Sequence, residues 1–289
     1  MKRKTFASAI ISIAIVSICV NLIAFEWPQE EVTHESFSSV FGQLRNGIFN
    51  TSIVFSDPAE IKPCIKGNVV AVVGKNSGEM GWFESPLGNA VILAHEDELL
   101  SVYANLETVD IPKGLTYISA DDVIGTSGSS GWQHGQSSLE FQIIDIQKHS
   151  VINPRLLLPK LENDPKVHSY GITMVNRKGE EYDLRTRRSL PAGAYMVYRT
   201  REQNFMPYST TVSVNGAAVE TITFDMLGRT DTKLTVSGKK TYNVKDIYPN
   251  NTKQFLAEVT LSQGKNTLNI STKNINGEET SLTYILDIR

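Results

Sequence analysis

The sequence contains little of what would point to several specialised classes of protein. Only two of its 289 residues are cysteines, Cys19 and Cys64, so neither a disulfide-knit scaffold nor a cysteine-rich zinc fold is expected. Lys and Arg number 28 against 31 Asp and Glu, and this net charge of -3 gives no reason to expect nucleic-acid binding. Prolines and glycines are spread along the chain, which argues against low complexity or wholesale disorder. What remains is an ordinary globular composition, long enough for two domains.

The first 24 residues differ from the rest of the chain. Three basic residues at positions 2–4 precede an uncharged apolar run from Phe6 to Ala24. This order is typical of a secretory leader, and the small residue Ala24 favours cleavage before Phe25. The run is also long enough to remain as a single membrane anchor. We therefore expect export to the periplasm or cell envelope, with a signal peptide or N-terminal anchor at residues 1–24 and no other membrane contact.

The remaining cysteine, Cys64, has no partner for a disulfide once a leader that contains Cys19 is removed. A lone cysteine between apolar segments is more often a small buried residue than a reactive thiol. We therefore expect Cys64 to pack in a core.

Strand signals dominate the chain beyond residue 24, and no stretch keeps a 3.6-residue apolar period over three turns. Clusters of Gly, Ser and Asn, such as residues 125–131, separate short runs that are rich in β-branched residues. The sequence therefore predicts an all-β protein. In its first half, strands are expected at residues 68–73, 89–94, 100–104, 115–118 and 139–146.

The second half has a different pattern, which begins after a proline-containing linker near residue 160. Apolar residues alternate with polar ones from Val212 to Ile288, which indicates strands with one buried face. Asn215-Gly216 and Asn276-Gly277 lie between such runs, and both residue types tolerate the positive φ of a tight hairpin turn. Seven or so short strands predict an immunoglobulin-like (Ig-like) β-sandwich over residues 161–289. The Cys…Trp…Cys signature of true immunoglobulin domains is absent, so the likeness concerns architecture only.

A series of short motifs runs in order between Phe41 and Leu158, and no single one of them is specific. Their order and spacing resemble the lysostaphin-type (LytM-like) zinc endopeptidases, which cut peptide cross-links in bacterial peptidoglycan. The resemblance implies that residues 25–160 form a LytM-like β-sheet domain of the duplicated hybrid motif type. The motifs are FGQLR at 41–45, IKGNVVA at 65–71, GNAVILAH at 88–95, SVYANL at 101–106, VIGTSGSSG at 123–131, LEFQI at 139–143 and Asn153-Pro154.

The same resemblance implies where a zinc site would lie. Family members bind zinc through the His and Asp of H-x-G-x-D and the second His of H-x-H, and two further histidines assist catalysis. The three ligand positions fall here on Asn50, Val54 and Glu140. The two catalytic histidine positions fall on Asn105 and Ser138. All five positions have therefore changed.

These five replacements remove the chemistry of the site. Val54 cannot coordinate a metal, and the neutral amide of Asn50 is a poor zinc ligand. Glu140 alone cannot hold zinc against water, and without the metal the pKa of water stays near its bulk value. We therefore expect a degenerate peptidase domain with no cofactor, no catalytic residue and no metal ligand.

The groove that binds wall peptide in catalytic relatives would be lined here by Trp82, His95, Tyr103 and Trp132, although core packing explains such aromatic residues equally well. An enzymatic alternative is a relocated zinc site that uses His95, His134 and Glu140. His134 lies in a Gly-rich segment, where a solvated turn residue is the simpler interpretation.

The resemblance to inactive members of the family implies a noncatalytic envelope protein. Such a protein regulates or scaffolds peptidoglycan hydrolases such as an amidase, or binds another envelope protein or peptidoglycan itself. The alternatives are the rearranged zinc endopeptidase and a structural or adhesive surface protein. Residues 25–160 carry 8 basic against 17 acidic residues, and residues 161–289 carry 17 against 14. The acidic first domain therefore favours a basic protein surface, and contact with anionic polymer is left to the second domain.

Overall fold

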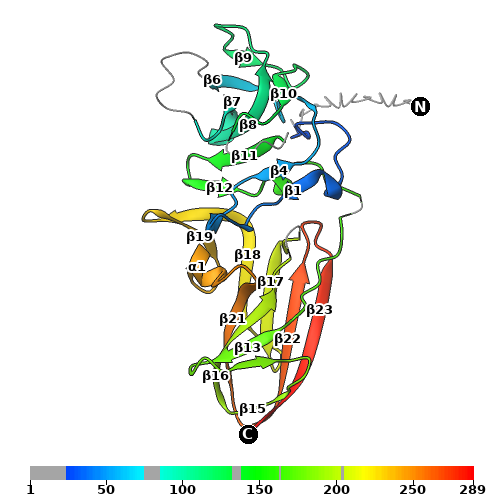
Figure 1. Ribbon diagram of the computed structural model, residues 1–289, viewed down its shortest axis with the longest axis vertical. Helices are drawn as coiled ribbons and strands as arrows, with labels where there is room; N and C mark the ends of the chain where they lie inside the picture. Colours follow the sequence, from blue (N-terminus) through cyan, green and yellow to red (C-terminus); the bar gives the residue numbers. More distant parts are fainter. Residues whose placement is uncertain (1–23, 75–84, 132–137, 163, 203–204) are drawn as a thin grey trace, which may run out of the picture.

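The computed structural model describes residues 24–74, 85–131, 138–162, 164–202 and 205–289. Strands β1–β12 form the upper part of the molecule in Figure 1 and strands β13–β23 the lower part. The described helices are short: α1 (Val244–Ile247) and the 3-10 helices η1 (His34–Ser36), η2 (Glu96–Glu98) and η3 (Pro154–Leu156). The all-β expectation is therefore confirmed. Within the described ranges no helix is both long and apolar enough to cross a membrane. Residues 1–23 of the expected leader lie outside these ranges.

The first part is an antiparallel sheet built around β8 (Leu99–Val109). Residues 101–106 of this strand are all buried, and β7 pairs with β8 along one edge while β11 and β10 pair along the other. Further pairings join β6 to β7 and β9, β4 to β1 and β11, β5 to β10, and β12 to β11. The strands are β1 (Phe37–Ser39), β4 (Ile53–Phe55), β5 (Glu60–Ile61), β6 (Gly67–Val73), β7 (Asn89–Ala94), β9 (Tyr117–Ile118), β10 (Gly125–Ser127), β11 (Glu140–Asp145) and β12 (Ser150–Ile152).

Three of the five strands expected in the first half are confirmed within one residue at each end. The strand expected at residues 100–104 is longer, at Leu99–Val109, and the fifth is shorter than expected. Residues 115–118 were expected to form a strand, but only Tyr117–Ile118 do so. The backbone N–H of Leu115 instead donates to the carbonyl of Pro112 (3.1 Å), in a turn where Gly114 has a φ of +86°. Leu115 therefore belongs to a turn, and only the second half of this run pairs in the sheet.

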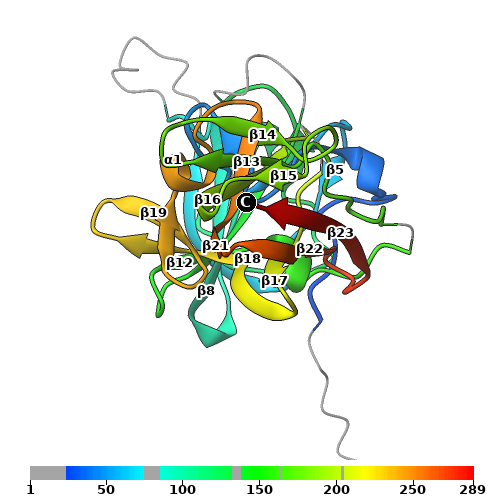
Figure 2. The same ribbon diagram turned by 90° about the horizontal axis from the view of Figure 1, so that it is seen from below.

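The second part packs two sheets face to face, and Figure 2 shows them from below. One sheet has the order β14-β13-β16-β21, and the other contains β15, β23, β22, β17, β18, β19 and β20. The Asn215-Gly216 turn is confirmed, with φ values of +52° and +85° between β17 and β18. An immunoglobulin-like strand order stays a prediction. The strands are β13 (Thr173–Asn176), β14 (Glu181–Asp183), β15 (Ser189–Leu190), β16 (Gly193–Thr200), β17 (Ser209–Val214), β18 (Ala217–Thr230), β19 (Lys233–Ser237), β20 (Thr241–Asn243), β21 (Lys253–Leu261), β22 (Gly264–Lys273) and β23 (Glu279–Ile288).

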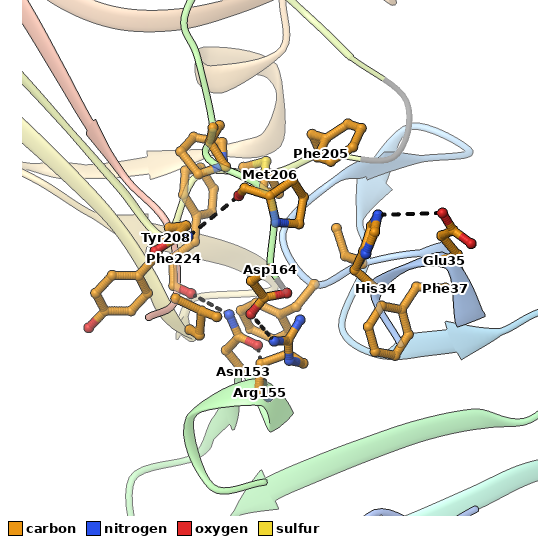
Figure 3. Close-up of a pocket in the computed structure, with 17 residues that line it drawn as sticks. His34, Glu35, Phe37, Asn153, Arg155, Asp164, Phe205, Met206, Tyr208 and Phe224 are labelled. Carbon is orange, nitrogen blue, oxygen red and sulfur yellow. Dashed lines mark hydrogen bonds and ion pairs between the residues drawn. The ribbon is translucent and has the colours of Figure 1, made fainter. Parts of the chain in front are cut away.

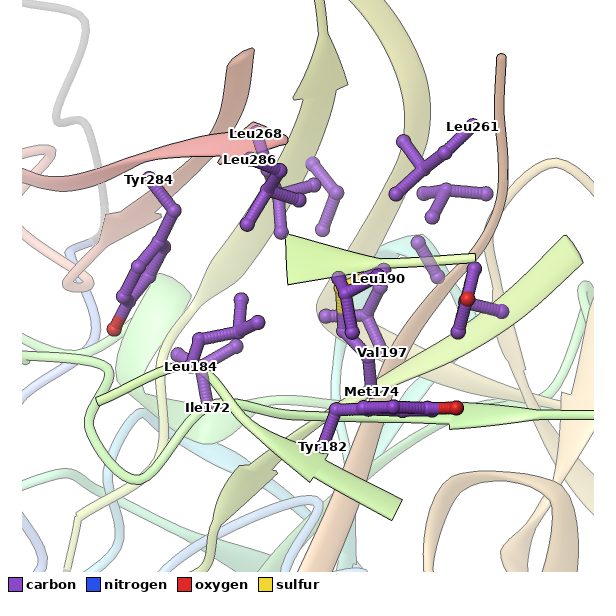
Figure 4. Close-up of a cluster of buried hydrophobic side chains, with 14 of the residues drawn as sticks. Ile172, Met174, Tyr182, Leu184, Leu190, Val197, Leu261, Leu268, Tyr284 and Leu286 are labelled. Carbon is purple, nitrogen blue, oxygen red and sulfur yellow. The ribbon is translucent and has the colours of Figure 1, made fainter. Parts of the chain in front are cut away.

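The core of this sandwich is made by alternate residues of both sheets. Met174 and Val197 from the first sheet meet Leu268 and Leu286 from the second, and these side chains lie inside the layer drawn in Figure 4. Residues between them on the same strands face solvent, as Met196 and Ile285 do. The period-2 alternation of the sequence therefore reports the buried face correctly.

Strand β18 joins the two parts of the molecule. Its first half pairs with β17, and its second half reaches β12 of the first part, where Val151 and Ile152 lie opposite Leu227 and Met226. The side-chain amide of Asn153 donates to the carbonyl of Phe224 (3.0 Å). The linker expected near residue 160 thus connects two parts that a continuous run of strand pairing already joins.

A third core cluster fills the junction below the first sheet. Phe41 and Phe49 from the first part are buried with Phe224 and Tyr248 from the second, and the Tyr248 hydroxyl donates to the carbonyl of Gly42 (2.8 Å). Gly42 has a φ of +81°, and a Cβ there would lie 2.6 Å from Cδ1 of Phe224. The second part therefore holds the short hairpin of β2 (Leu44–Arg45) and β3 (Ile48–Phe49) in a fixed position.

Candidate functional site

The strand register places two of the three positions that the family resemblance assigns to zinc ligands side by side. Glu140 of β11 lies opposite Val54 of β4 on one side and opposite Ala104 of β8 on the other. Because residues directly opposite on neighbouring strands point to the same face, the Val54 and Glu140 side chains share one face of the sheet. Val54 is buried and offers only methyl groups to its surroundings.

Asn50, the remaining ligand position, stabilises the turn that leads into β4. Its side-chain nitrogen lies within hydrogen-bonding distance of the hydroxyl of Ser39 (2.9 Å) and of the carbonyls of Val40 and Ser52 (both 3.0 Å). Its side-chain oxygen accepts from the backbone N–H of Ser52 (3.4 Å) and lies 2.9 Å from the Ser52 hydroxyl. The amide of Asn50 therefore forms hydrogen bonds to the backbone groups around it, which is a structural role.

Arg45 supplies a cation at this place. Its Nη1 lies 3.1 Å from Oε1 of Glu140 and 3.5 Å from Oδ1 of Asn50, and the hydroxyl of Ser52 lies 2.8 Å from the same carboxylate oxygen. The side chains of Arg45 and Glu140 are 18% and 13% exposed. A carboxylate this far from water needs an opposite charge, and the guanidinium provides it.

Sequence reasoning gave Arg45 no role, although it is the last residue of the FGQLR motif at 41–45. One signal was present: a single acidic residue at a ligand position that has lost its companions needs a cation, and Arg45 is the basic residue nearest Asn50 in sequence. The position of Arg45 depends on the β2–β3 hairpin. Residues of the second part of the molecule pack against that hairpin and hold it in place.

This set of residues does not fit zinc. A catalytic zinc site needs three nitrogen, sulfur or carboxylate donors with an open fourth position. Here one position is an amide, one is an isopropyl group, and the carboxylate of the third is paired with Arg45. Within the described ranges, no group of three or more His, Cys, Asp or Glu residues is placed to hold a metal ion.

Asn105 and Ser138, the two positions that the family resemblance assigns to catalytic histidines, contact one another. Nδ2 of Asn105 lies 2.8 Å from the carbonyl of Ser138 and 3.1 Å from its hydroxyl, and it also donates to the carbonyl of Gly128. Oδ1 of Asn105 accepts from the backbone N–H of Gly131 (2.8 Å). Asn105 is fully buried at a φ of +67°, a conformation that asparagine tolerates better than most residues. The amide thus ties β8 to Gly128, Gly131 and Ser138.

Tyr103, expected as a residue of the groove, is instead part of the core. It is 0% exposed and its ring packs 5.2 Å from that of Phe141. Its hydroxyl donates to Sγ of Cys64 (3.1 Å) and accepts from the backbone N–H of Cys64 (2.7 Å). The groove expectation was wrong for this residue, because β8 is buried on both faces where Tyr103 lies.

Cys64 is buried as expected. Burial raises the pKa of its thiol to about 12, so the thiol is neutral at physiological pH. The thiolate is the reactive form of cysteine, and Cys64 is therefore a core residue.

His95 is half-buried with both ring nitrogens engaged. Nδ1 lies 2.9 Å from the carbonyl of Lys66, and Nε2 lies 2.7 Å from the hydroxyl of Ser101. Burial lowers the pKa of His95, so the neutral ring is favoured, with Nδ1–H as the donor to Lys66. Loss of either contact would be needed before this imidazole could bind a ligand.

The relocated zinc site that would use His95 and Glu140 is incompatible with the sheet. His95 follows Ala94, which lies opposite Leu100 of β8, and Glu140 lies opposite Ala104. His95 is thus level with Leu99, five residues along the strand from Ala104, which corresponds to about 16 Å. Two ligands of one zinc ion cannot be this far apart. The third residue of the relocated zinc site, His134, lies outside the described residues. The expected groove residues Trp82 and Trp132 lie outside them as well.

A separate hollow of about 280 Å³ opens at the junction of the two parts (Figure 3). Arg155 lies at its base, paired with Asp164, and its guanidinium carbon lies 5.4 Å from the centroid of the Phe37 ring. Met206 and Phe224 contribute apolar walls from the second part. The ion pair fixes the segment that leads out of η3 against the first sheet, which is a structural role.

Comparisons with known proteins agree with this architecture. The family model of peptidase family M23 matches residues 52–154, and a separate family model matches residues 167–289. The chain is 33% identical over 130 residues to an uncharacterized protein of Treponema pallidum (strain Nichols), a match that covers 39% of this chain and 81% of the relative.

Among solved structures, the SpoIIIAH–SpoIIQ complex contains a chain that is 19% identical, with 44% of this chain and 95% of that one covered and a TM-score of 0.34. The catalytic domain of lysostaphin from Staphylococcus simulans is 23% identical, with 37% and 76% covered and a TM-score of 0.30. The match to the family model identifies residues 52–154 of this chain as a domain of peptidase family M23.

Proposed function

We propose that this protein is a noncatalytic cell-envelope protein whose M23 domain regulates or scaffolds peptidoglycan hydrolases through protein contacts. The observation that carries this proposal is the Arg45–Glu140 pair at the former metal site. The pair supplies internally the charge balance that an M23 peptidase takes from zinc.

The geometry of the pair also opposes the return of a metal. A divalent cation beside Glu140 would lie next to the Arg45 guanidinium, and two like charges a few ångströms apart repel strongly even at the effective dielectric of a protein surface. Arginine remains charged at every physiological pH, so deprotonation cannot relieve this repulsion. Without a metal, no group at this site activates water for attack on a peptide bond.

Export and the choice of partner belong to the same proposal. The leader-like residues 1–24 support a periplasmic or envelope location, either through a cleaved signal or as an anchored protein. The excess of 17 acidic over 8 basic residues in 25–160 supports a basic protein surface as the partner of the M23 domain.

The test uses purified protein that begins after the leader. Metal content is measured by mass spectrometry after dialysis against zinc, and release of soluble muropeptides from purified sacculi is measured with lysostaphin as the active control. We expect no stoichiometric zinc and no release. One zinc per chain together with muropeptide release would overturn the proposal.

Regulation is tested by adding the protein to an amidase that digests labelled sacculi. We expect the digestion rate to change in proportion to the protein added, and to remain unchanged with a heat-denatured sample. An amidase rate that does not respond, together with no binding to sacculi, would leave the scaffold proposal without support.

A further inference from the structure

The hollow of about 280 Å³ at the junction of the two parts is bounded by both of them, and we call it the junction hollow. Its lining residues lie within residues 34–41 and 153–167 on one side, and within residues 205–208, 224 and 274–275 on the other. This volume lies at the lower end of the range for ligand pockets, so the hollow suits a single side chain or a small molecule.

The junction hollow is preformed, because hydrogen bonds join the two parts around it. The backbone N–H of Asn153 donates to the carbonyl of Asp225 (2.8 Å), and its side-chain amide donates to the carbonyl of Phe224 (3.0 Å; Figure 3). The hydroxyl of Thr272 donates to the carbonyl of Val167 (3.0 Å). The shape of the hollow is therefore part of the fold.

Much of the wall of the junction hollow is apolar. Val40 from the first part and Met206 and Ile275 from the second line it, and all three are half-buried. Apolar surface of this kind loses contact with water when a ligand covers it, and that burial favours binding. The walls therefore suit an apolar group.

One hydrogen-bond acceptor in the junction hollow is left open. The side chain of Asp164 is only 6% exposed, and its Oδ2 is paired with Nη2 of Arg155. Its Oδ1 has no hydrogen-bond partner among the described residues and is not fully enclosed. In Figure 3 this second oxygen points away from Arg155, toward the space between Asp164 and His34, and all three residues line the hollow. A donor that enters the hollow can therefore reach it.

The charges around Asp164 decide what kind of donor fits. Arg155 balances the negative charge of Asp164, and the Arg155 guanidinium carbon lies 5.4 Å from the centroid of the Phe37 ring. Glu35, the other acidic residue among the described lining residues, is exposed and lies 4.0 Å from Nε2 of His34. A cationic ligand would approach Arg155 as closely as Asp164 and would be repelled. A neutral N–H or O–H donor on an apolar body fits both the walls and the open oxygen.

We propose that the junction hollow binds a tryptophan or tyrosine side chain that a protein partner presents. Both side chains combine a flat apolar body with one neutral donor, the indole N–H or the phenol O–H. Such residues are enriched among those that fill pockets at the centre of protein interfaces. The inference rests on the proposed function, because it names the surface through which the protein would contact its partner.

The test uses isotope-labelled protein that begins after the leader, with N-acetyl-tryptophanamide as the probe. Amide chemical shifts are recorded by NMR as the probe is added. We expect saturable shifts of residues that line the junction hollow, with a dissociation constant in roughly the millimolar range. A second probe carries benzothienylalanine, in which sulfur replaces the indole N–H, and we expect it to bind about fivefold more weakly.

The variant Ile275→Trp fills the hollow from its own wall, and it should weaken binding of the tryptophan probe about tenfold or more. The matched control is Ile285→Trp, the same substitution at a residue that is exposed and does not line the hollow. Its affinity should stay within about twofold of the wild type. Equal weakening in both variants, or no saturable shift in the wild type, would overturn the junction hollow as a binding site. Thermal unfolding of each variant confirms that it is folded.

A further variant tests the role of Asp164. Arg155→Met with Asp164→Ala removes both members of the ion pair, so no unpaired charge remains. We expect this variant to bind the two probes with affinities within about twofold of each other, because the acceptor is gone. A preference for the indole that persists in the folded variant, or equal binding of the two probes to the wild type, would overturn Asp164 as the acceptor.

The outcome is separable from the test of the proposed function. Muropeptide release by the wild-type protein would overturn the noncatalytic function and leave the binding of the probe as it stands. Absence of probe binding would overturn the junction hollow alone.

Discussion

The positions that the family resemblance assigns to zinc ligands and those it assigns to catalytic histidines are stabilised in different ways. At the first, the remaining carboxylate of Glu140 is paired with Arg45, which comes from a hairpin held by the other part of the molecule. At the second, Asn105 and Ser138 are both neutral, and nearby backbone groups satisfy their hydrogen bonds. A buried charge needs an opposite charge, even from a residue far away in sequence, whereas neighbouring backbone groups can satisfy a buried neutral group.

The largest effect is expected from rebuilding the metal site. Asn50→His, Val54→Asp and Glu140→His restore the ligand types of the family, and Arg45→Ala removes the competing cation. Because Val54 and Glu140 still share one face of the sheet, we expect this variant to bind about one zinc per chain with roughly micromolar affinity or better. Isothermal titration calorimetry with zinc measures the stoichiometry and the affinity.

The control for that variant keeps Val54 and changes the other three positions, so only two ligands are present. It should bind zinc far more weakly. If both variants fail to bind while remaining folded, the former ligand positions do not converge as the strand register indicates.

The next largest effect is expected from breaking the charged pair. Arg45→Met leaves the carboxylate of Glu140 without its cation, and we expect a loss of about 3 kcal/mol in the free energy of unfolding. The double variant Arg45→Met with Glu140→Gln should lose less than the single one, because the unpaired charge is gone. Urea unfolding monitored by tryptophan fluorescence measures this. A double variant less stable than Arg45→Met would show that charge balance is not what the pair provides.

A smaller loss is expected at the neutral site. Asn105→Ala removes the amide that ties three segments together and leaves a residue that disfavours a φ of +67°, so we expect a loss of about 2 kcal/mol. Asn105→Gly, which accepts that φ, separates the backbone cost from the hydrogen bonds. Equal stability of both variants with the wild type would contradict the structural role of this amide.

The smallest effect concerns a second buried neutral group, Cys64, and depends on pH. Its pKa is raised in the folded state from 9.0 to about 12, so the stabilisation from the neutral thiol is complete below about pH 9 and is lost as pH rises toward 12. The stability difference between the wild type and Cys64→Ala should therefore shrink by about 1 kcal/mol between roughly pH 8 and pH 10. A difference that stays constant with pH would contradict the burial of this thiol.

Much of the fold could be predicted from the sequence, because strand signals are local. The ends of β7 fell at the expected residues, and the Asn215-Gly216 turn followed from the two residues that form it. Leu115 was assigned to a strand because its apolar run was considered without the turn at Pro112. Tyr103 was assigned to a groove because sequence cannot distinguish an aromatic residue that faces a cleft from one in a strand buried on both faces.

The sequence by itself determined which side chains stand at the five positions that the family resemblance assigns to zinc chemistry, because ligand chemistry depends on the identity of each side chain. It also determined the strands, because alternation and turn residues act over a few positions. Only the tertiary structure decided that Arg45 would meet Glu140 and that β18 would pair with β12. Each of these contacts joins residues far apart in the chain, and their meeting depends on the packing of the whole molecule.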